Sequence, residues 1–219
     1  YDMADLGSAS SESLSQYRQV WLFATDEMDA TAQMIVAAYI TGGGHAIIYP
    51  CLPDRETSQQ PCRVLRDAIG VTPSGTEVTD SPLIDFLDLH DIKCSNPQVV
   101  FTPESLTGAE IIARTLSGTP CGFEKRVGKG KVTFIGTWVG FDTEAHRALY
   151  EKLLGRSAAR LRNATSDNEF IIARQRFTCD GRALLFVANY YNEEMSGSDT
   201  CTHPVWCETI SLPLSGKKI

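Results

Sequence analysis

The chain has 219 residues, 42% of them hydrophobic, and a formal net charge of -7 at pH 7. Such a chain can bury a full core, either as one large domain or as one domain with part of another, and we favour the second arrangement. The pI of about 5.1 and the lack of a strongly basic run argue against a nucleic-acid partner, because phosphate binding needs clustered lysine and arginine. No apolar run approaches the roughly 20 residues of a membrane span, so no membrane contact is expected.

Seven cysteines, an odd number, are scattered along the sequence. A chain of this size folds without disulfides, so the pattern favours a reduced, intracellular protein, and we expect a cytoplasmic location. Cys201, His203 and Cys207, with Cys179 as a fourth ligand, suggest a zinc site, but they lack the paired C-x-x-C spacing and Pro204 interrupts their strand. Ordinary loop and core positions are the better interpretation, and we expect neither a metal nor another cofactor.

Residues 20–50 predict a strand, a helix and a second strand. Residues 20–24 are a continuous apolar run, typical of a strand that is covered on both faces in a parallel sheet. Asp29 is placed to cap the helix, and Gly42-Gly43-Gly44 ends it. Residues 46–49 form the second buried strand. The apolar stripe of the helix consists of Ala32, Ile35, Val36, Tyr39 and Ile40.

The other elements follow in chain order. Residues 1–7 resemble the middle of a domain that begins upstream, and residues 8–15 are expected to form a serine-rich loop. Further helices are predicted from Pro61 to Gly70 and after Asp142, and residues 71–83 are predicted to be a surface connection. Strands are predicted at residues 86–89, 99–101, 110–115, 121–127, 131–136, 170–177, 182–189 and 206–212.

The change from helical to strand patterns indicates a domain boundary. No helix signal appears beyond residue 168, whereas helices and strands are mixed before it. We therefore expect an α/β domain over residues 1–156, a linker at residues 157–167, and the start of a β-sandwich-like, all-β domain over residues 168–219.

Four motifs occur in a distinctive order along the first of these domains. They are YRQVWLFATDEMD at residues 17–29, GGH at 43–45, YPCLP at 49–53 and VGKGKVTFIGT at 127–137. Together they resemble the middle domain of bacterial β-galactosidases of glycoside hydrolase family 42 and of the long family 35 type. The resemblance covers about residues 1–156, and the tail is similar to the β-domain that follows in those enzymes.

The resemblance implies both a fold and a role. The fold would be a flavodoxin-like or class I glutamine amidotransferase-like sheet with helices on both faces, from which the amidotransferase chemistry has been lost. In some relatives this domain mediates trimerisation, so a homo-oligomer, trimer or dimer, is implied. The catalytic barrel that precedes the domain in such enzymes is missing from this sequence, and it would be the partner of this segment in the same polypeptide. A galactoside would be the substrate of that parent protein.

Candidate site residues are few. A retaining glycosidase needs two carboxyl groups about 5 to 5.5 Å apart, and because nothing in the sequence matches that arrangement, we expect no catalytic residue. Asp26 and Glu27 follow a strand, at the edge where α/β sheets bind ligands, and are substrate-adjacent candidates, although helix capping and the helix dipole explain this acidic cluster better. Glu104 has the same standing. Trp138, at a strand end, is a third candidate that can stack on a sugar, although core packing is favoured.

Two other functions compete with this interpretation. A free-standing amidotransferase-like enzyme or small-ligand binder would use Cys51 or the Asp26–Glu27 edge, but Pro50 and Pro53 flank this cysteine in a way that is hostile to a nucleophile elbow. A pure interaction module would form a dimer or trimer and bind no small molecule. Lys129 between two glycines could suggest phosphate binding, but a hairpin turn explains it better.

Overall fold

The computed structural model describes residues 5–140 and 146–156 and, beyond these, the strand segments 165–166, 171–177, 183–189 and 210–211. The chain divides into two units, Tyr1–Ala159 and Arg160–Ile219. The division falls inside the predicted linker, most of which lies outside the described residues.

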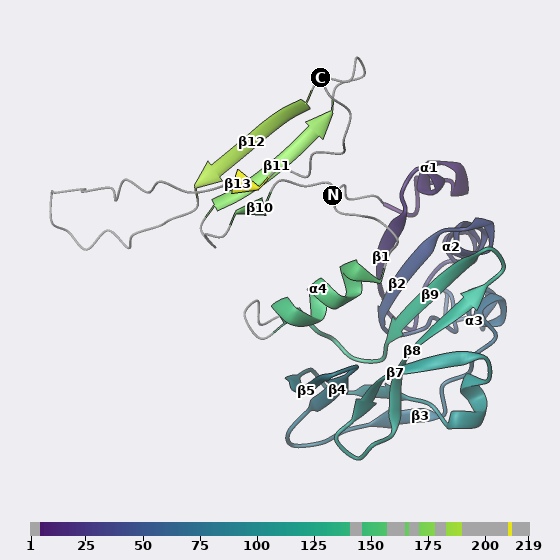
Figure 1. Ribbon diagram of the computed structural model, residues 1–219. Coiled ribbons are helices and arrows are strands. Elements are labelled where there is room, and N and C mark those ends of the chain that lie inside the picture. The colour runs from purple at the N-terminus through teal and green to yellow at the C-terminus, as the bar shows by residue number, and fades with distance from the viewer. Residues whose placement is uncertain are drawn as a thin grey trace, which may run out of the picture. The chain divides into compact units, whose positions relative to one another are not determined.

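A mixed sheet forms the centre of the first unit (Figure 1). Three strands, β1, β2 and β9, run parallel to one another, and the remaining neighbours pair antiparallel. A flavodoxin-like arrangement is therefore not confirmed. In spatial order the strands are β1 (Gln19–Ala24), β2 (His45–Pro50), β9 (Gly130–Ile135), β8 (Pro120–Val127), β7 (Ala109–Thr115), β4 (Leu83–Phe86) and β5 (Leu89–Lys93).

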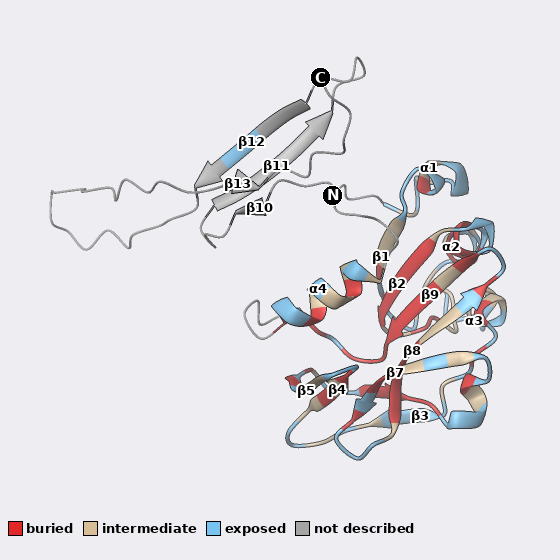
Figure 2. Ribbon diagram, in the orientation of Figure 1, coloured by how far each residue is buried: buried red, intermediate tan, exposed pale blue. Residues whose placement is uncertain are grey.

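Helices cover both faces of this sheet, as the sequence predicts. Alternate residues of β2 point into two separate buried clusters: Ala46 and Ile48 pack with helices α2 and α3, and Ile47 and Tyr49 pack with helix α4. Figure 2 shows that β2 and β9, in the centre of the sheet, are largely buried. The helices are α1 (Ser11–Ser15), α2 (Ala30–Gly42), α3 (Val64–Ile69) and α4 (Arg147–Gly155), with a short 3-10 helix, η1 (Pro103–Leu106).

The position of β1 differs from the prediction. The apolar run indicated a strand covered on both faces, but β1 lies at the edge of the sheet and only Leu22 and Ala24 are buried. Phe23 is 58% exposed. An unbroken apolar sequence is therefore compatible with an edge strand here, because one face packs into the core while the other carries large side chains at the surface.

Helix boundaries depart from the prediction at three places. The expected serine-rich loop contains α1, because the Ser10 and Ser13 side chains form a reciprocal capping box. Helix α3 begins at Val64 rather than at Pro61, which instead forms an isolated β-bridge with Arg55. Helix α4 is preceded by His146, whose ring accepts from the backbone N–H of Gly140. The predicted cap, Asp142, lies outside the described residues.

The strand predicted at residues 86–89 is wrong, because these residues include the turn between β4 and β5. Leu87 has a φ of 55°, so the backbone reverses there instead of extending. The predicted connection at residues 71–83 contains a strand, β3 (Gly75–Glu77), which pairs with β6 (Gln98–Val100). Pairing with a distant segment supplied the hydrogen bonds that local sequence did not indicate.

The three consecutive strands β7, β8 and β9 are confirmed, and a close backbone contact joins them to α2. The turn at Gly128–Lys129 connects β8 to β9, so the hairpin interpretation of Lys129 is also confirmed. This turn rests on the carboxyl end of α2: the Lys129 N–H donates to the Thr41 carbonyl at 3.0 Å, and the Lys131 N–H donates to the Gly44 carbonyl at 3.0 Å. The glycine run at residues 42–44 and the Gly128-Lys129-Gly130 turn, two glycine motifs that are remote in sequence, thus contact each other.

In the second unit, the described segments pair as antiparallel strands. β11 (Ile171–Phe177) pairs with β12 (Ala183–Asn189), which confirms the predicted hairpin. β10 (Thr165–Ser166) pairs with β13 (Ile210–Ser211), the described part of the strand predicted at residues 206–212. A complete β-domain over residues 168–219 stays a prediction.

Candidate functional site

The carboxyl ends of β1, β2 and β9 lie at one edge of the sheet, because these strands are parallel neighbours. Open α/β sheets bind ligands at such an edge. Four candidate residues lie at this edge: Asp26 and Glu27 follow β1, Cys51 follows β2, and Trp138 follows β9. Glu104 lies in η1, after β6, a strand outside this sheet. Whether this edge borders a substrate stays a prediction.

The two acidic candidates hold a loop in place. The Asp26 carboxylate lies 3.1 Å from the guanidinium of Arg55, and the Asp26 carbonyl accepts from the N–H groups of Asp54 and Arg55 at 3.0 and 3.2 Å. The Glu27 carboxylate accepts from the Gln59 amide at 2.6 Å. Both side chains thus fasten the loop at residues 51–62 to the end of β1, which is a structural task.

Charged residues of the same loop form further ion pairs and hydrogen bonds. Asp54 pairs with Arg55 and Arg66 at 3.3 Å each, and the Arg66 guanidinium donates to the Leu52 carbonyl at 2.6 and 3.0 Å. Asp29 sits at the N-cap of α2, but its side chain makes no capping bond; it accepts from the Thr57 hydroxyl at 2.7 Å. The expected capping role of Asp29 is therefore wrong, because the loop competes for its carboxylate.

Cys51 lacks the features of an activated nucleophile. Burial, and then the negative charge of Asp26, raise the pKa of its thiol, so it stays protonated near neutral pH. Two of the histidines contact other groups: the ring nitrogens of His45 lie near Thr133 and Gln19, and His90 lies 3.3 Å from Asp85. Nothing in this arrangement favours an amidotransferase reaction.

An aromatic cluster, Phe23, Tyr49 and Trp138, occupies the same edge. The Phe23 ring centroid lies 4.6 Å from that of Tyr49 and 5.4 Å from that of Trp138, and those of Tyr49 and Trp138 are 6.0 Å apart. Tyr49 is buried, but Phe23 is 58% exposed and Trp138 is 40% exposed. Trp138 therefore packs on its neighbours and still presents a surface, and its place beside a substrate stays a prediction.

A partly buried polar network connects the sheet to the end of α4, and sequence reasoning missed it. The Glu124 carboxylate accepts from Arg156 Nε at 2.7 Å, from Lys131 Nζ at 3.1 Å and from the Thr133 hydroxyl at 3.1 Å. Burial acts to raise the pKa of Glu124, but the hydrogen bonds from Arg156 and Lys131 outweigh it, and the pKa is lowered. The only sequence signal was the occurrence of polar residues within apolar strands.

His45 is a buried member of this network. Trp21 Nε1 donates to Gln19 Oε1 at 2.9 Å, which turns the Gln19 amide nitrogen toward His45 Nδ1, 3.2 Å away. His45 Nδ1 is then an acceptor, and Nε2 carries the proton toward the Thr133 hydroxyl at 2.8 Å. Burial, and then the charge of Lys131, lower the pKa of His45 to about 4, so the ring is neutral near pH 7.

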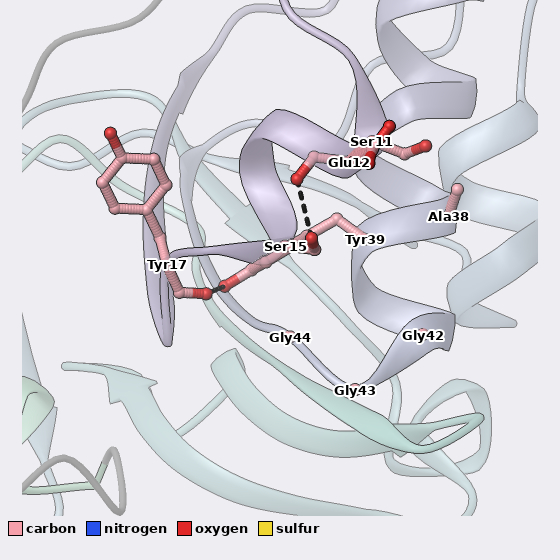
Figure 3. A pocket seen from close by; sticks show the side chains of 9 residues that line it. All are labelled: Ser11, Glu12, Ser15, Tyr17, Ala38, Tyr39, Gly42, Gly43 and Gly44. Atoms are coloured by element: carbon pink, nitrogen blue, oxygen red, sulfur yellow. Dashed lines mark hydrogen bonds between the residues drawn. The ribbon is translucent and has the colours of Figure 1, made fainter.

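A shallow polar pocket of about 340 Å³ lies elsewhere, between α1 and the carboxyl end of α2 (Figure 3). The Tyr39 hydroxyl donates to the Tyr17 carbonyl at 3.0 Å across it. Its lining is mostly hydroxyls and glycine backbone, with Glu12 as the only charged residue: Ser11, Glu12, Ser15, Tyr17, Ala38, Tyr39, Gly42, Gly43 and Gly44. Because Gly44 precedes β2, the pocket is not at the carboxyl edge of the sheet.

Among the described residues, no group of three or more histidine, cysteine, aspartate or glutamate side chains is arranged to hold a metal ion. The zinc candidates Cys179, Cys201, His203 and Cys207 lie outside the described residues. None of the helices that the structure describes is long and apolar enough to cross a lipid bilayer.

The chain is similar to parts of larger carbohydrate-active proteins. It is 27% identical over 201 residues to a β-1,2-glucosyltransferase of Ignavibacterium album, and the match covers 88% of this chain and 26% of that protein. It is also 27% identical over 201 residues to an exo-β-D-glucosaminidase of Pyrococcus horikoshii, which covers 90% of this chain and 25% of that protein. The chain thus spans about a quarter of the length of these curated relatives.

Solved structures share the fold. A β-galactosidase from Bacillus circulans sp. alkalophilus superposes with a TM-score of 0.65 at 16% identity, over 80% of this chain and 27% of that chain. A family 42 β-galactosidase from G. stearothermophilus superposes with a TM-score of 0.64 at 14% identity, over 80% of this chain and 26% of that chain. Residues 1–106 match the family model described as GLMA-like, second domain. These findings agree with the resemblance found in the sequence: residues 1–106 match the GLMA-like second domain, and the chain has the fold that occurs in β-galactosidases of glycoside hydrolase family 42.

Proposed function

We propose that this chain is a non-catalytic structural segment of a β-galactosidase-like glycoside hydrolase, and that it packs against a catalytic barrel of the same polypeptide. One observation carries the proposal: the relatives match 88% and 90% of this chain but only 26% and 25% of their own lengths. The relatives and the fold neighbours are named for reactions of glycosides, as a glucosyltransferase, a glucosaminidase and β-galactosidases.

The state of the carboxylates supports a structural role. A glycosidase acid or nucleophile must reach the substrate, and two such groups must converge. Asp26, Asp54 and Glu124 are each paired with arginine, and Glu27 accepts from Gln59. These acidic groups hold loops and helices to the sheet, so the hydrolytic carboxylates are assigned to the barrel.

The proposal has several finer parts. The segment joins subunits into a dimer or trimer, the parent acts on a galactoside, and the protein works in the cytoplasm, where Cys51, Cys62, Cys94 and Cys121, which are free thiols, stay reduced. The amidotransferase-like origin of the α/β domain and the β-domain over residues 168–219 also belong to this proposal.

The test uses the purified 219-residue chain. With nitrophenyl β-galactoside, β-glucoside and β-glucosaminide, we expect no release of nitrophenol above the buffer rate, and light scattering should show a concentration-dependent dimer or trimer. The matched control is the double variant Asp26→Asn with Glu27→Gln. Hydrolysis by the native chain that this double variant loses would overturn the proposal.

A further inference from the structure

We infer that the aromatic cluster of Phe23, Tyr49 and Trp138 is a binding site for the apolar face of a β-hexopyranoside ring. This inference rests on the proposed function, because it takes its ligand class from the parent enzyme, but it assigns sugar contact to the segment itself. The cluster lies where β1, β2 and β9 end, which is the edge at which parallel strands present ligand sites.

Two rings of the cluster are accessible to a ligand. Phe23 is 58% and Trp138 is 40% exposed, and their centroids are 5.4 Å apart with ring planes inclined at 47°. Two large aromatic rings side by side at the surface form an apolar patch that water solvates poorly. A pyranose ring has a face of C–H groups that stacks on aromatic rings, while its hydroxyls remain free to bind water or polar side chains.

The floor of the cluster is fixed before any ligand arrives. Tyr49 is 1% exposed, and the ring of Trp21 meets it edge-on at a centroid distance of 6.2 Å. Trp21 in turn packs on Tyr150 of α4 at 5.3 Å. Because the ring of Tyr49 is already packed against its neighbours, a stacked ligand would order few additional side chains. The loss of conformational entropy on binding is smaller at such a preorganised site.

The polar surroundings suit a neutral polyol. Three residues beyond Phe23, the Asp26 carboxylate is neutralised by Arg55, and both side chains are partly exposed, at 55% and 41%. An ion pair of this kind offers donors and acceptors to hydroxyl groups without a net charge. A charged ligand would gain little here, whereas a sugar has the matching combination of an apolar face and a hydroxyl rim.

The experiment is ligand-observed saturation-transfer NMR on the full chain with methyl β-galactoside, methyl β-glucoside and methyl β-glucosaminide. We expect saturation on the ring C–H protons of one face and a dissociation constant on the order of 1 mM. Trp138→Ala and Phe23→Ala should each weaken binding about tenfold, and Trp138→Phe should retain most of it. Leu116→Ala is the matched control, since Leu116 is a 61% exposed apolar residue in the turn between β7 and β8.

Binding that survives both alanine variants, or the absence of saturation transfer for all three glycosides, would overturn the inference. Self-association that is lost in Phe23→Ala, without any sugar signal, would assign the patch to a second copy of the chain and would overturn it too. Failure of the proposed function appears separately, as nitrophenol release by the native chain.

Discussion

Gly130 marks the contact between the two glycine motifs, and its replacement is a direct test of the fold. A Cβ atom at Gly130 would overlap the carbonyl oxygens of Gly44 and Ile40, and would lie 2.9 Å from the carbonyl carbon of Gly43. These are backbone atoms at the end of α2 and the start of β2, so no side-chain rotation can relieve the overlap. In Gly130→Ala, β9 must therefore move away from α2.

The size of the effect follows from what this movement breaks. It disrupts the hydrogen bonds from Lys129 to Thr41 and from Lys131 to Gly44, both 3.0 Å long, and each is worth about 1 kcal/mol. Overpacking adds about 1 to 2 kcal/mol. We expect the free energy of unfolding to fall by about 3 kcal/mol, and Tm to fall by roughly 10 °C.

Gly42→Ala is the matched control. Gly42 ends α2, a Cβ there meets no atom within 4 Å, and its φ is not positive. Alanine should raise the free energy of unfolding by about 0.5 to 1 kcal/mol, because it restricts the unfolded chain. Urea unfolding followed by circular dichroism measures both variants. If the free energy of unfolding of Gly130→Ala stays within about 0.5 kcal/mol of that of the native chain, the contact between the two motifs does not stabilise the fold as we expect.

Three further predictions concern charge, pH and thiols. Arg66→Ala should lower the free energy of unfolding by about 2 kcal/mol in urea, because it removes both guanidinium hydrogen bonds to the Leu52 carbonyl and one of the two ion pairs of Asp54. Arg55→Ala, at a 41% exposed side chain, should change it by less than about 1 kcal/mol; equal effects would contradict this. The pKa of His45 is about 4 in the folded chain, against an ordinary value of 6.5, so the unfolded chain binds the proton first as the pH is lowered. The free energy of unfolding should therefore decrease by about 2 kcal/mol from about pH 7 to pH 5. An unchanged pH dependence in His45→Gln would show that the effect has another origin. Cys94 and Cys121 are buried and burial raises the pKa of both thiols, so mass spectrometry should find them unmodified by iodoacetamide until urea unfolds the chain; alkylation in the native state would refute their burial.

Local sequence patterns predicted several elements well. The end of α2 at the glycine run, the buried strand β2, and the succession β7, β8 and β9 are each encoded in a contiguous segment, where side-chain period and turn residues act directly. Three residues of the predicted stripe of α2 are buried, Val36, Tyr39 and Ile40. The motif order also indicated the resemblance to the middle domain of family 42 β-galactosidases, with which the comparisons agree. Asp26, Glu27 and Trp138 lie at the ends of parallel strands, as expected, and their place beside a substrate stays a prediction.

Contacts between distant segments decided the rest. β1 became an edge strand because β9, far along the chain, took the other side of β2. The Asp29 carboxylate accepts a hydrogen bond from Thr57 instead of capping α2. Phe23, in the apolar run of β1, lies at the surface beside Trp138. Sequence by itself determines which residues prefer a helix, a strand or a turn, since these preferences are local. The partner of each carboxylate and of each aromatic ring is decided only when remote strands pack, because the tertiary fold sets the distances between these side chains.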